Sequence, residues 1–327
     1  MPAVTVSIIK LKGGVGKSTL TMLLGEFLAF RHSKNVLLID MDAQANLSYC
    51  MVPDYHIQNQ NRERRTAFHL LRSGLHLGPL DIEHYITQPP LVVSNISRSG
   101  SYGTNLHMVV STPSVAQLDE ELLELWDAGR PMPRRVRETL LLAINPARER
   151  YDYILIDCPP GLSLFSSAAL IASDYYISPI IPEPLSLQGV DLVHDRQEQL
   201  MQRYGAKVEF KGVVLNVVKH YRNTHSRVAG AVYTRDSIRY EPFDCWLPDN
   251  ERLRTIGEYD PEVEGKWAMG SEHKFSDLHH KYGLSYRLTN PQEGTLNREE
   301  DEGRKYRLED RIHSLVVEFM ERCQPQS

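Results

Sequence analysis

A glycine-rich loop near the start of the chain constrains its fold more than any other feature. The loop, residues 12–19 (KGGVGKST), follows an apolar segment at 4–9 and precedes another at 20–24. Glycines let successive backbone N–H groups turn inward around an anion, and a helix that starts there adds its positive N-terminal end. The sequence therefore predicts a strand, a phosphate-binding loop and a helix, in that order.

The residues of this loop have different predicted roles. Lys17 supplies a full positive charge to the β- and γ-phosphates of a nucleotide, and the Ser18 hydroxyl is placed to bind Mg²⁺. Thr19 is expected to contact the α-phosphate through its hydroxyl or its backbone N–H. The expected cofactors are therefore ATP and Mg²⁺. The loop residues expected to bind the nucleotide are Gly13, Gly14, Val15, Gly16, Lys17, Ser18 and Thr19.

The loop departs from the common pattern G-x-x-x-x-G-K-[ST]. Leu11 stands where that pattern has its first glycine, and a second lysine, Lys12, precedes the glycine pair. This is the deviant Walker A form, x-K-G-G-x-x-K-[ST]. Because Lys17 already occupies the phosphate cradle, Lys12 is expected to neutralise a phosphate across a dimer interface. The alternative is a solvated lysine beside the loop.

Carboxylates end two further apolar segments. Residues 36–39 lead into Asp40 and Asp42, and residues 153–156 lead into Asp157. A carboxylate at the C-terminal end of a parallel strand points into the crevice where open α/β sheets bind ligands. We expect Asp157 to hold Mg²⁺ through water. Aspartate also caps helices, and this role is the alternative for Asp42.

These elements, in this order, resemble the ParA/MinD family of P-loop ATPases, and ParA-type partition ATPases in particular. Residues 40–46 (DMDAQAN) match the family's D-x-D-P-Q-x-N, except that alanine stands where proline is usual. Two prolines follow the Walker B strand at 159–160, and 162–190 and 246–253 (WLPDNERL) also follow the family pattern. The resemblance covers residues 1–255 and the last helix.

The resemblance implies a mechanism. In the family, the extra lysine reaches across an ATP-sandwich dimer to the partner's nucleotide, which gives Lys12 a catalytic role beside Lys17. Asp42 is implied to orient the attacking water, and Asp40 to support the Mg²⁺ shell. In relatives, the residue at the position of Asn216 reads the adenine base, and those at the positions of Pro248 and Asp249 pack beside it. The alternative for Asn216 is a turn residue at the end of a strand.

Strand-like and helical segments alternate along the chain to about residue 250. The strand-like segments are 4–9, 36–39, 106–110, 153–156, 175–181, 212–218 and 243–247. This alternation predicts an α/β fold in which helices flank both faces of a mostly parallel, twisted sheet. We expect a P-loop ATPase domain at 1–257, a late polar insertion of unassigned role at 258–307, and a C-terminal helix within 308–327 that packs on the domain.

Charge and cysteine content exclude several classes of protein. The net charge is −5, so a uniformly basic nucleic-acid binder is not expected. No run of about 18 apolar residues is present, so a transmembrane helix is not expected either. The four cysteines form no C-x-x-C pair, which is typical of reduced thiols in a cytoplasmic protein. One stretch is basic, and its cations are Lys219, Arg222, Arg227, Arg235 and Arg239.

Three functions fit these features. The first is a ParA-like ATPase that dimerises with ATP, binds DNA without sequence preference through the basic stretch, and hydrolyses ATP slowly to partition or position a cargo. Such an ATPase would work with a ParB-like or other adaptor protein. It would lie in the cytoplasm, and on the nucleoid if it binds DNA. The alternative for the basic stretch is a solvated helix face. The second is a regulatory ATPase subunit that docks through 258–307. The third, a MinD-like membrane-surface ATPase, is disfavoured because the last helix is acidic as well as amphipathic.

Overall fold

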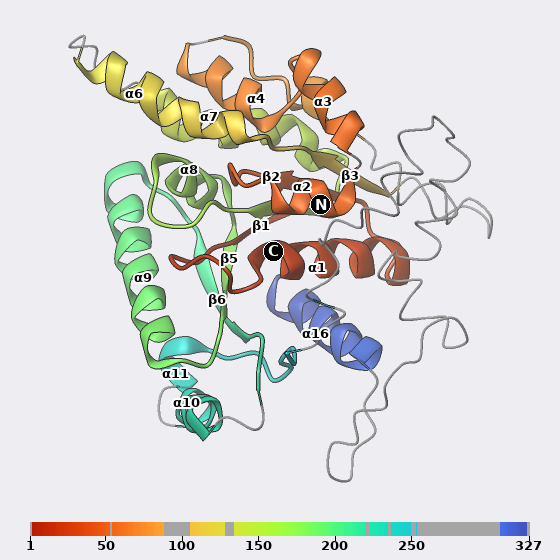
Figure 1. Cartoon of the computed structure of the whole chain (residues 1–327), viewed down its shortest axis with the longest axis vertical. Helices are drawn as coiled ribbons and strands as arrows, with labels where there is room; N and C mark the ends of the chain where they lie inside the picture. Colours follow the sequence, from red (N-terminus) through yellow and green to blue (C-terminus); the bar gives the residue numbers. More distant parts are fainter. Residues whose placement is uncertain are drawn as a thin grey trace.

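Six parallel strands form one sheet, in the order β3-β2-β4-β1-β5-β6. The sheet lies at the centre of the molecule, between the helices (Figure 1). The structure is a computed structural model that describes residues 2–52, 54–76, 78–87, 105–127, 134–219, 223–234, 237–249, 253 and 308–325. The predicted insertion at 258–307 lies outside these residues. The strands are β1 Val4–Ile8, β2 Val36–Asp40, β3 Leu106–Val109, β4 Tyr153–Asp157, β5 Tyr175–Ile180 and β6 Glu209–Leu215.

Helices cover both faces of the sheet, which confirms the predicted fold class (Figure 1). On one face lie α4 Ala67–Leu75, α6 Gln117–Asp127, α7 Arg134–Ile144, α8 Leu164–Ala172 and α9 Pro184–Tyr204. On the other lie α1 Lys17–Arg31, α2 Asn46–Met51, α3 Asp54–Arg62 and α16 Leu308–Arg322. Beside the edge strand β6 lie α10 Asn223–Tyr233 and α11 Ser237–Tyr240. The described residues also include short 3₁₀ turns, η1 Ile82–Tyr85, η2 Pro113–Ala116 and η3 Asn145–Glu149.

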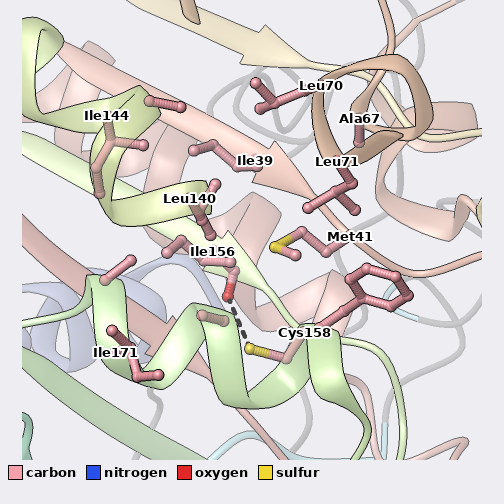
Figure 2. Close-up of a cluster of buried hydrophobic side chains, with 14 of the residues drawn as sticks. Ile39, Met41, Ala67, Leu70, Leu71, Leu140, Ile144, Ile156, Cys158 and Ile171 are labelled. Carbon is pink, nitrogen blue, oxygen red and sulfur yellow. Dashed lines mark hydrogen bonds between the residues drawn. The ribbon is translucent and has the colours of Figure 1, made fainter. Parts of the chain in front are cut away.

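Strands β1, β2 and β4 are buried on both sides because helices cover both faces of the sheet. In β4, Ile154 and Ile156 pack under α7 and α8, whereas Leu155 packs toward α1. Figure 2 shows the first of these clusters, where Ile156 and Leu140 lie between the sheet and the helices. A sheet buried in this way leaves only its ends for binding, so ligand contacts must come from the loops at the carboxyl ends of the strands.

The start and end of α9 follow from its sequence. Pro184 occupies the first helical position, where its missing N–H is not needed, and Glu183 precedes it as the N-cap residue. Gly205 ends the helix in the left-handed region at φ 67°. The first turn of α9 lies beside the segment that leaves β1, where Lys10 donates a hydrogen bond to the carbonyl group of Ser186.

The prediction of a strand at 243–247 is wrong. Phe243 and Leu247 donate backbone hydrogen bonds to β6, to carbonyl groups only two residues apart. The chain between them is therefore too long to run in register with β6. The two residues after Phe243 donate their N–H groups to the Glu318 carboxylate of α16 instead. A regular ladder gives way here to a bulged segment held by the C-terminal helix.

Candidate nucleotide-binding site

The glycine-rich loop connects β1 to α1 in the predicted manner. Gly14 and Gly16 have positive φ angles of 73° and 81°, which residues with a side chain rarely adopt. Nothing lies within 4 Å of the position where Gly14 would carry a Cβ, so the space beside this glycine is open. Lys17 begins α1 and is 6% exposed, and Ser18 and Thr19 follow it half-buried. The N–H groups of this first turn and the loop can therefore surround an anion.

Asn216, at the end of β6, supports the loop. Its Nδ2 atom donates a 2.8 Å hydrogen bond to the carbonyl group of Val15, and its Oδ1 atom accepts one of 2.9 Å from the N–H of Val217. A Cβ on Gly16 would lie 2.2 Å from the same Nδ2 atom, so the loop and the asparagine fit only because residue 16 is glycine. The predicted contact with adenine stays a prediction.

The other two residues expected near adenine lie just beyond β6. Pro248 is buried and forms a parallel bridge with Val218. Asp249 pairs with Lys219 at 3.1 Å between carboxylate and ammonium. The segment that carries both is held against the end of β6, the strand that also supplies Asn216. A base contact at either residue stays a prediction.

Asp40 and Asp157 lie side by side at the ends of β2 and β4. Asp40 is satisfied within the protein: it accepts hydrogen bonds from the N–H of Asp42 and from the N–H and hydroxyl of Ser48, at 2.7 to 3.0 Å. Burial raises the pKa of Asp40, and the charge of Asp157 raises it further. Three of the about four acceptor sites of this carboxylate are therefore already used within the protein.

One carboxylate oxygen of Asp157 is available to a cation. Its Oδ1 atom accepts a 3.5 Å hydrogen bond from Thr21, whereas Oδ2 has no hydrogen-bond partner among the described residues although it is buried. Burial raises the pKa of Asp157, and Lys17 and the Ser18 and Thr21 hydroxyls oppose the rise. A carboxylate oxygen beside a serine hydroxyl is the donor set that Mg²⁺ prefers, so the residues present fit the predicted ion.

Asp42 is buried near the same strand ends at 5% exposure. Its Oδ1 atom accepts a 3.0 Å hydrogen bond from the N–H of Gln44, and its carbonyl group accepts one of 2.7 Å from Ser111. Helix α2 begins at Asn46 with Ala45 at its N-cap, so the alternative that Asp42 caps this helix is wrong. Its role in orienting water stays a prediction.

Lys12 leaves the loop in a different direction from Lys17. Its side chain is 58% exposed, and its ammonium lies 3.3 Å from the carboxylate of Glu183, the N-cap residue of α9. Neither Glu183 nor Lys10, which is fully buried against α9, is among the predicted site residues. The position of Lys10 directly after a strand-like apolar run is a signal of burial, but nothing in the pattern indicates its partner.

Comparisons with known proteins agree with this geometry. A family model described as an AAA domain matches residues 3–210. The sporulation initiation inhibitor protein Soj of Bacillus subtilis is 28% identical over 272 residues, which cover 80% of this chain and 92% of Soj. A virulence plasmid ParA family protein of Chlamydia psittaci is 25% identical over 233 residues, which cover 70% and 75% of the two chains. The chain belongs to the ParA/MinD family of P-loop ATPases.

A solved structure of the same fold supports the architecture of this ParA/MinD-family ATPase. The ATP complex of McdA from Cyanothece superposes with a TM-score of 0.58 at 17% identity, and the match covers 86% of this chain and 96% of McdA. The likeness extends well beyond the P-loop, to most of the sheet and its helices. Among the helices that the structure describes, none is both long and apolar enough to cross a membrane.

Two cations of the basic stretch form ion pairs with acids of the same chain. Arg222 and Arg235 lie outside the described residues. Lys219 pairs with Asp249, as noted above, and Arg239 of α11 pairs with Asp191 of α9 at 2.8 Å. Arg227 is exposed on α10. The described cations therefore do not form one uncompensated surface, and their predicted contact with DNA stays a prediction.

Proposed function

We propose that this protein is a ParA-type partition ATPase that forms a dimer around two ATP molecules and hydrolyses them slowly. The observation that carries the proposal is the separation of the two loop lysines. Lys17 is buried at the start of α1, whereas Lys12 is exposed and rests on Glu183, outside the phosphate cradle. A lysine placed in this way can leave a weak surface ion pair and neutralise the nucleotide of a second subunit.

The remaining site residues divide the work of phosphoryl transfer between positioning and charge neutralisation. The loop N–H groups, Lys17 and Thr19 hold the phosphates, while Ser18 and Asp157 hold Mg²⁺ and Asp40 supports its shell. Bound Mg²⁺ would neutralise charge on the β- and γ-phosphates. Asp42 orients the attacking water. At the other end of the nucleotide, the base lies near Asn216, Pro248 and Asp249.

This arrangement makes the dimer depend on the γ-phosphate. An exposed lysine–carboxylate pair such as Lys12–Glu183 contributes only about 0–1 kcal/mol, so a triphosphate on a second subunit can compete for the lysine. After hydrolysis and phosphate release, the charge that attracted Lys12 is smaller, and the lysine can return to Glu183. ATP binding and hydrolysis thus time the association of two subunits.

We further propose that the dimer binds DNA without sequence preference through the basic stretch, and that an adaptor of the ParB type stimulates hydrolysis. Doubling the number of lysine and arginine contacts on dimerisation raises affinity for the phosphate backbone. Arg227 is exposed on α10 and available for such a contact. The protein would then lie in the cytoplasm on the nucleoid.

The dimer is tested by light scattering with AMPPNP and Mg²⁺. We expect the wild type to double in mass, Lys12→Ala to bind the nucleotide but remain a monomer, and Asp42→Ala to stay dimeric with ATP because hydrolysis is blocked. Lys207→Ala, which removes an exposed lysine before β6, serves as the matched control. A wild-type protein that stays monomeric with AMPPNP, or a Lys12→Ala variant that dimerises normally, would falsify the proposal.

DNA binding is tested separately by a salt series with ATP, ADP and no nucleotide. Affinity for random-sequence duplex is expected only with ATP and should fall steeply as salt rises. Arg222→Glu combined with Arg235→Glu should remove this binding while dimerisation survives, and Arg203→Glu combined with Arg62→Glu, at exposed ends of α9 and α3, is the matched charge change. Equal DNA affinity of both variants would move the contact surface elsewhere and leave the ATPase assignment intact.

A further inference from the structure

A second lysine beside the P-loop is fully buried. Lys10 follows β1 and is 0% exposed, and its Nζ atom donates a hydrogen bond to the carbonyl group of Ser186 in the first turn of α9. Removing an ammonium group from water is costly unless hydrogen bonds or opposite charges compensate for it. An apolar side chain would fill this position between β1 and the P-loop at a lower free-energy cost, so the ammonium group of Lys10 is expected to have a specific role.

The helix approaches Lys10 closely because of a glycine. A Cβ on Gly189 would lie 3.1 Å from the Lys10 Nζ atom and 3.3 Å from its Cε atom, so a larger residue at 189 would push the helix or the lysine away. The opposite charge that acts on Lys10 is Asp191, which also pairs with Arg239 at 2.8 Å. Lys10 is thus enclosed by the first two turns of α9.

Lys10 and Lys12 contact the same end of the same helix. Lys10 bonds to Ser186 inside the first turn, and Lys12 pairs with Glu183 at the N-cap three residues earlier. The two contacts differ in kind: the first is buried and directed at a backbone carbonyl, whereas the second is exposed and easily exchanged. The buried contact holds the chain in place, and the exposed one leaves the side chain of Lys12 free to move.

We propose that Lys10 is a positioning residue for the ATP-dependent dimer: its ammonium fixes the segment that carries Lys12 against the start of α9, so that Lys12 leaves the loop in one direction. This inference rests on the proposed function. A fixed backbone at residues 10–12 lowers the conformational entropy that Lys12 loses when it reaches a second subunit. Lys10 itself touches neither nucleotide nor partner.

A purely structural role makes a different prediction. Methionine has a length similar to lysine but avoids the cost of burying an ammonium group, so Lys10→Met should fold at least as well as the wild type. If Lys10 acts only on stability, this variant should dimerise normally. If it positions Lys12, the variant should lose dimerisation while the phosphate cradle around Lys17 still binds nucleotide.

The experiment compares Lys10→Met with Lys207→Met, which removes an exposed lysine elsewhere. We expect equal or higher melting temperatures and an unchanged Kd for a fluorescent ATP analogue in both variants. In sedimentation with AMPPNP and Mg²⁺, only Lys10→Met should weaken the dimer, by about tenfold, because fixing the backbone of one freed residue costs an entropy of this order when the dimer forms. A dimer of wild-type strength in Lys10→Met would overturn the inference, as would a fall in melting temperature and nucleotide affinity alongside dimerisation.

A pH series adds a readout that simple packing would not move. Burial lowers the pKa of Lys10 to about 8; Asp191 of α9 opposes this shift, and Lys12 of the loop adds to it. Arg239 and Tyr240 of α11 act on Lys10 only through their contacts with Asp191. The wild-type dimer should weaken as the pH rises past 8, and Lys10→Met should lack that step. If the wild type forms no dimer with AMPPNP at any pH, the proposed function fails; if it does and both proteins share one pH profile, the inference alone fails.

Discussion

Asp40 and Asp157 end neighbouring parallel strands in direct register, and neither carboxyl group is exposed. Burial raises the pKa of both, and for Asp40 the charge of Asp157 raises it further. Two carboxylates this close in a buried site disfavour full ionisation. The free protein therefore retains protons at this site at pH values where exposed aspartates have none.

Binding of ATP with Mg²⁺ should release protons from this pair. A metal ligand must be deprotonated, so a carboxyl group with a raised pKa gives up its proton when the cation enters, and Mg²⁺ affinity increases with pH. Titration calorimetry at pH 7 in two buffers with different ionisation enthalpies would measure the release. Asp40→Asn should reduce it, because it removes both a titrating group and a neighbouring charge. Identical heats in the two buffers would contradict this prediction.

A third buried acid, Glu26 of α1, should make stability depend on pH. Its side chain is 3% exposed, its Oε2 atom has no hydrogen-bond partner in the described part of the chain, and burial raises its pKa to about 8. The folded protein thus holds a proton that the unfolded chain loses near pH 4.5. The free energy of unfolding contributed by this group is therefore highest below pH 4.5, falls as the pH rises to about 8, and then levels off.

Glu26→Gln should remove this dependence. The difference in unfolding free energy between the variant and the wild type should grow by on the order of 2–4 kcal/mol between pH 5 and pH 8, in favour of the variant. Urea unfolding at four pH values measures it, with Glu198→Gln on the exposed side of α9 as the control. The comparison of variants cancels the contributions of Asp40 and Asp157, which titrate in the same range. A constant difference across the series would show that Glu26 is ionised in the fold.

The local patterns of this sequence predict the strands and the P-loop well, because each depends on residues close in the chain. The glycines at 14 and 16, for example, fit positive φ angles that the loop requires by itself. Contacts between distant segments could not be predicted. The bond from Lys10 to Ser186 spans 176 residues and that from Asn216 to Val15 spans 201.

The failed strand at 243–247 has a related cause. Its apolar residues have the composition of a strand, but its N–H groups are divided between β6 and Glu318, which belongs to a helix about 70 residues further along the chain. No local pattern reports such a competing acceptor. The same holds for the predicted DNA-binding cations, since the acids that pair with Lys219 and Arg239 come from other elements of the fold.

The contact between Asn216 and the P-loop should control nucleotide affinity. Asn216→Ala removes the hydrogen bond to the Val15 carbonyl, which contributes about 0.5–1.5 kcal/mol, and should weaken ATP binding by up to about tenfold. Gly16→Ala should be more harmful, because its Cβ would lie 2.2 Å from the Asn216 amide and its φ angle is 81°. The measurement is the Kd of a fluorescent ATP analogue.

The double variant separates the two causes of the Gly16→Ala defect. Removing the Asn216 side chain relieves the steric clash but not the positive φ angle, so Gly16→Ala with Asn216→Ala should bind more tightly than Gly16→Ala alone. Binding should still be weaker than in Asn216→Ala, because the backbone strain remains. Strictly additive losses would show that the two residues do not meet in solution as they do in the structure.

The ion pair between Lys12 and Glu183 should oppose dimerisation slightly. Glu183→Gln keeps the size of the side chain but removes the charge that holds Lys12 on its own subunit, so the lysine becomes more available to a second one. Because exposed pairs contribute about 0.2–1 kcal/mol, the dimer with AMPPNP and Mg²⁺ should strengthen by at most about fivefold. Sedimentation at low salt measures the change, and added salt should reduce it.

The control is Glu209→Gln, which removes the charge from another lysine–glutamate pair, with Lys211 at 3.0 Å, away from the P-loop. It should leave the dimer unchanged. Lys10→Met and Glu183→Gln act on the same end of α9 and should shift the dimer in opposite directions, because one loosens the backbone that carries Lys12 and the other releases its side chain. A weaker dimer in Glu183→Gln would mean that Glu183 remains bonded to Lys12 in the dimer, and the exchange of Lys12 between carboxylate and phosphate would then have to be abandoned.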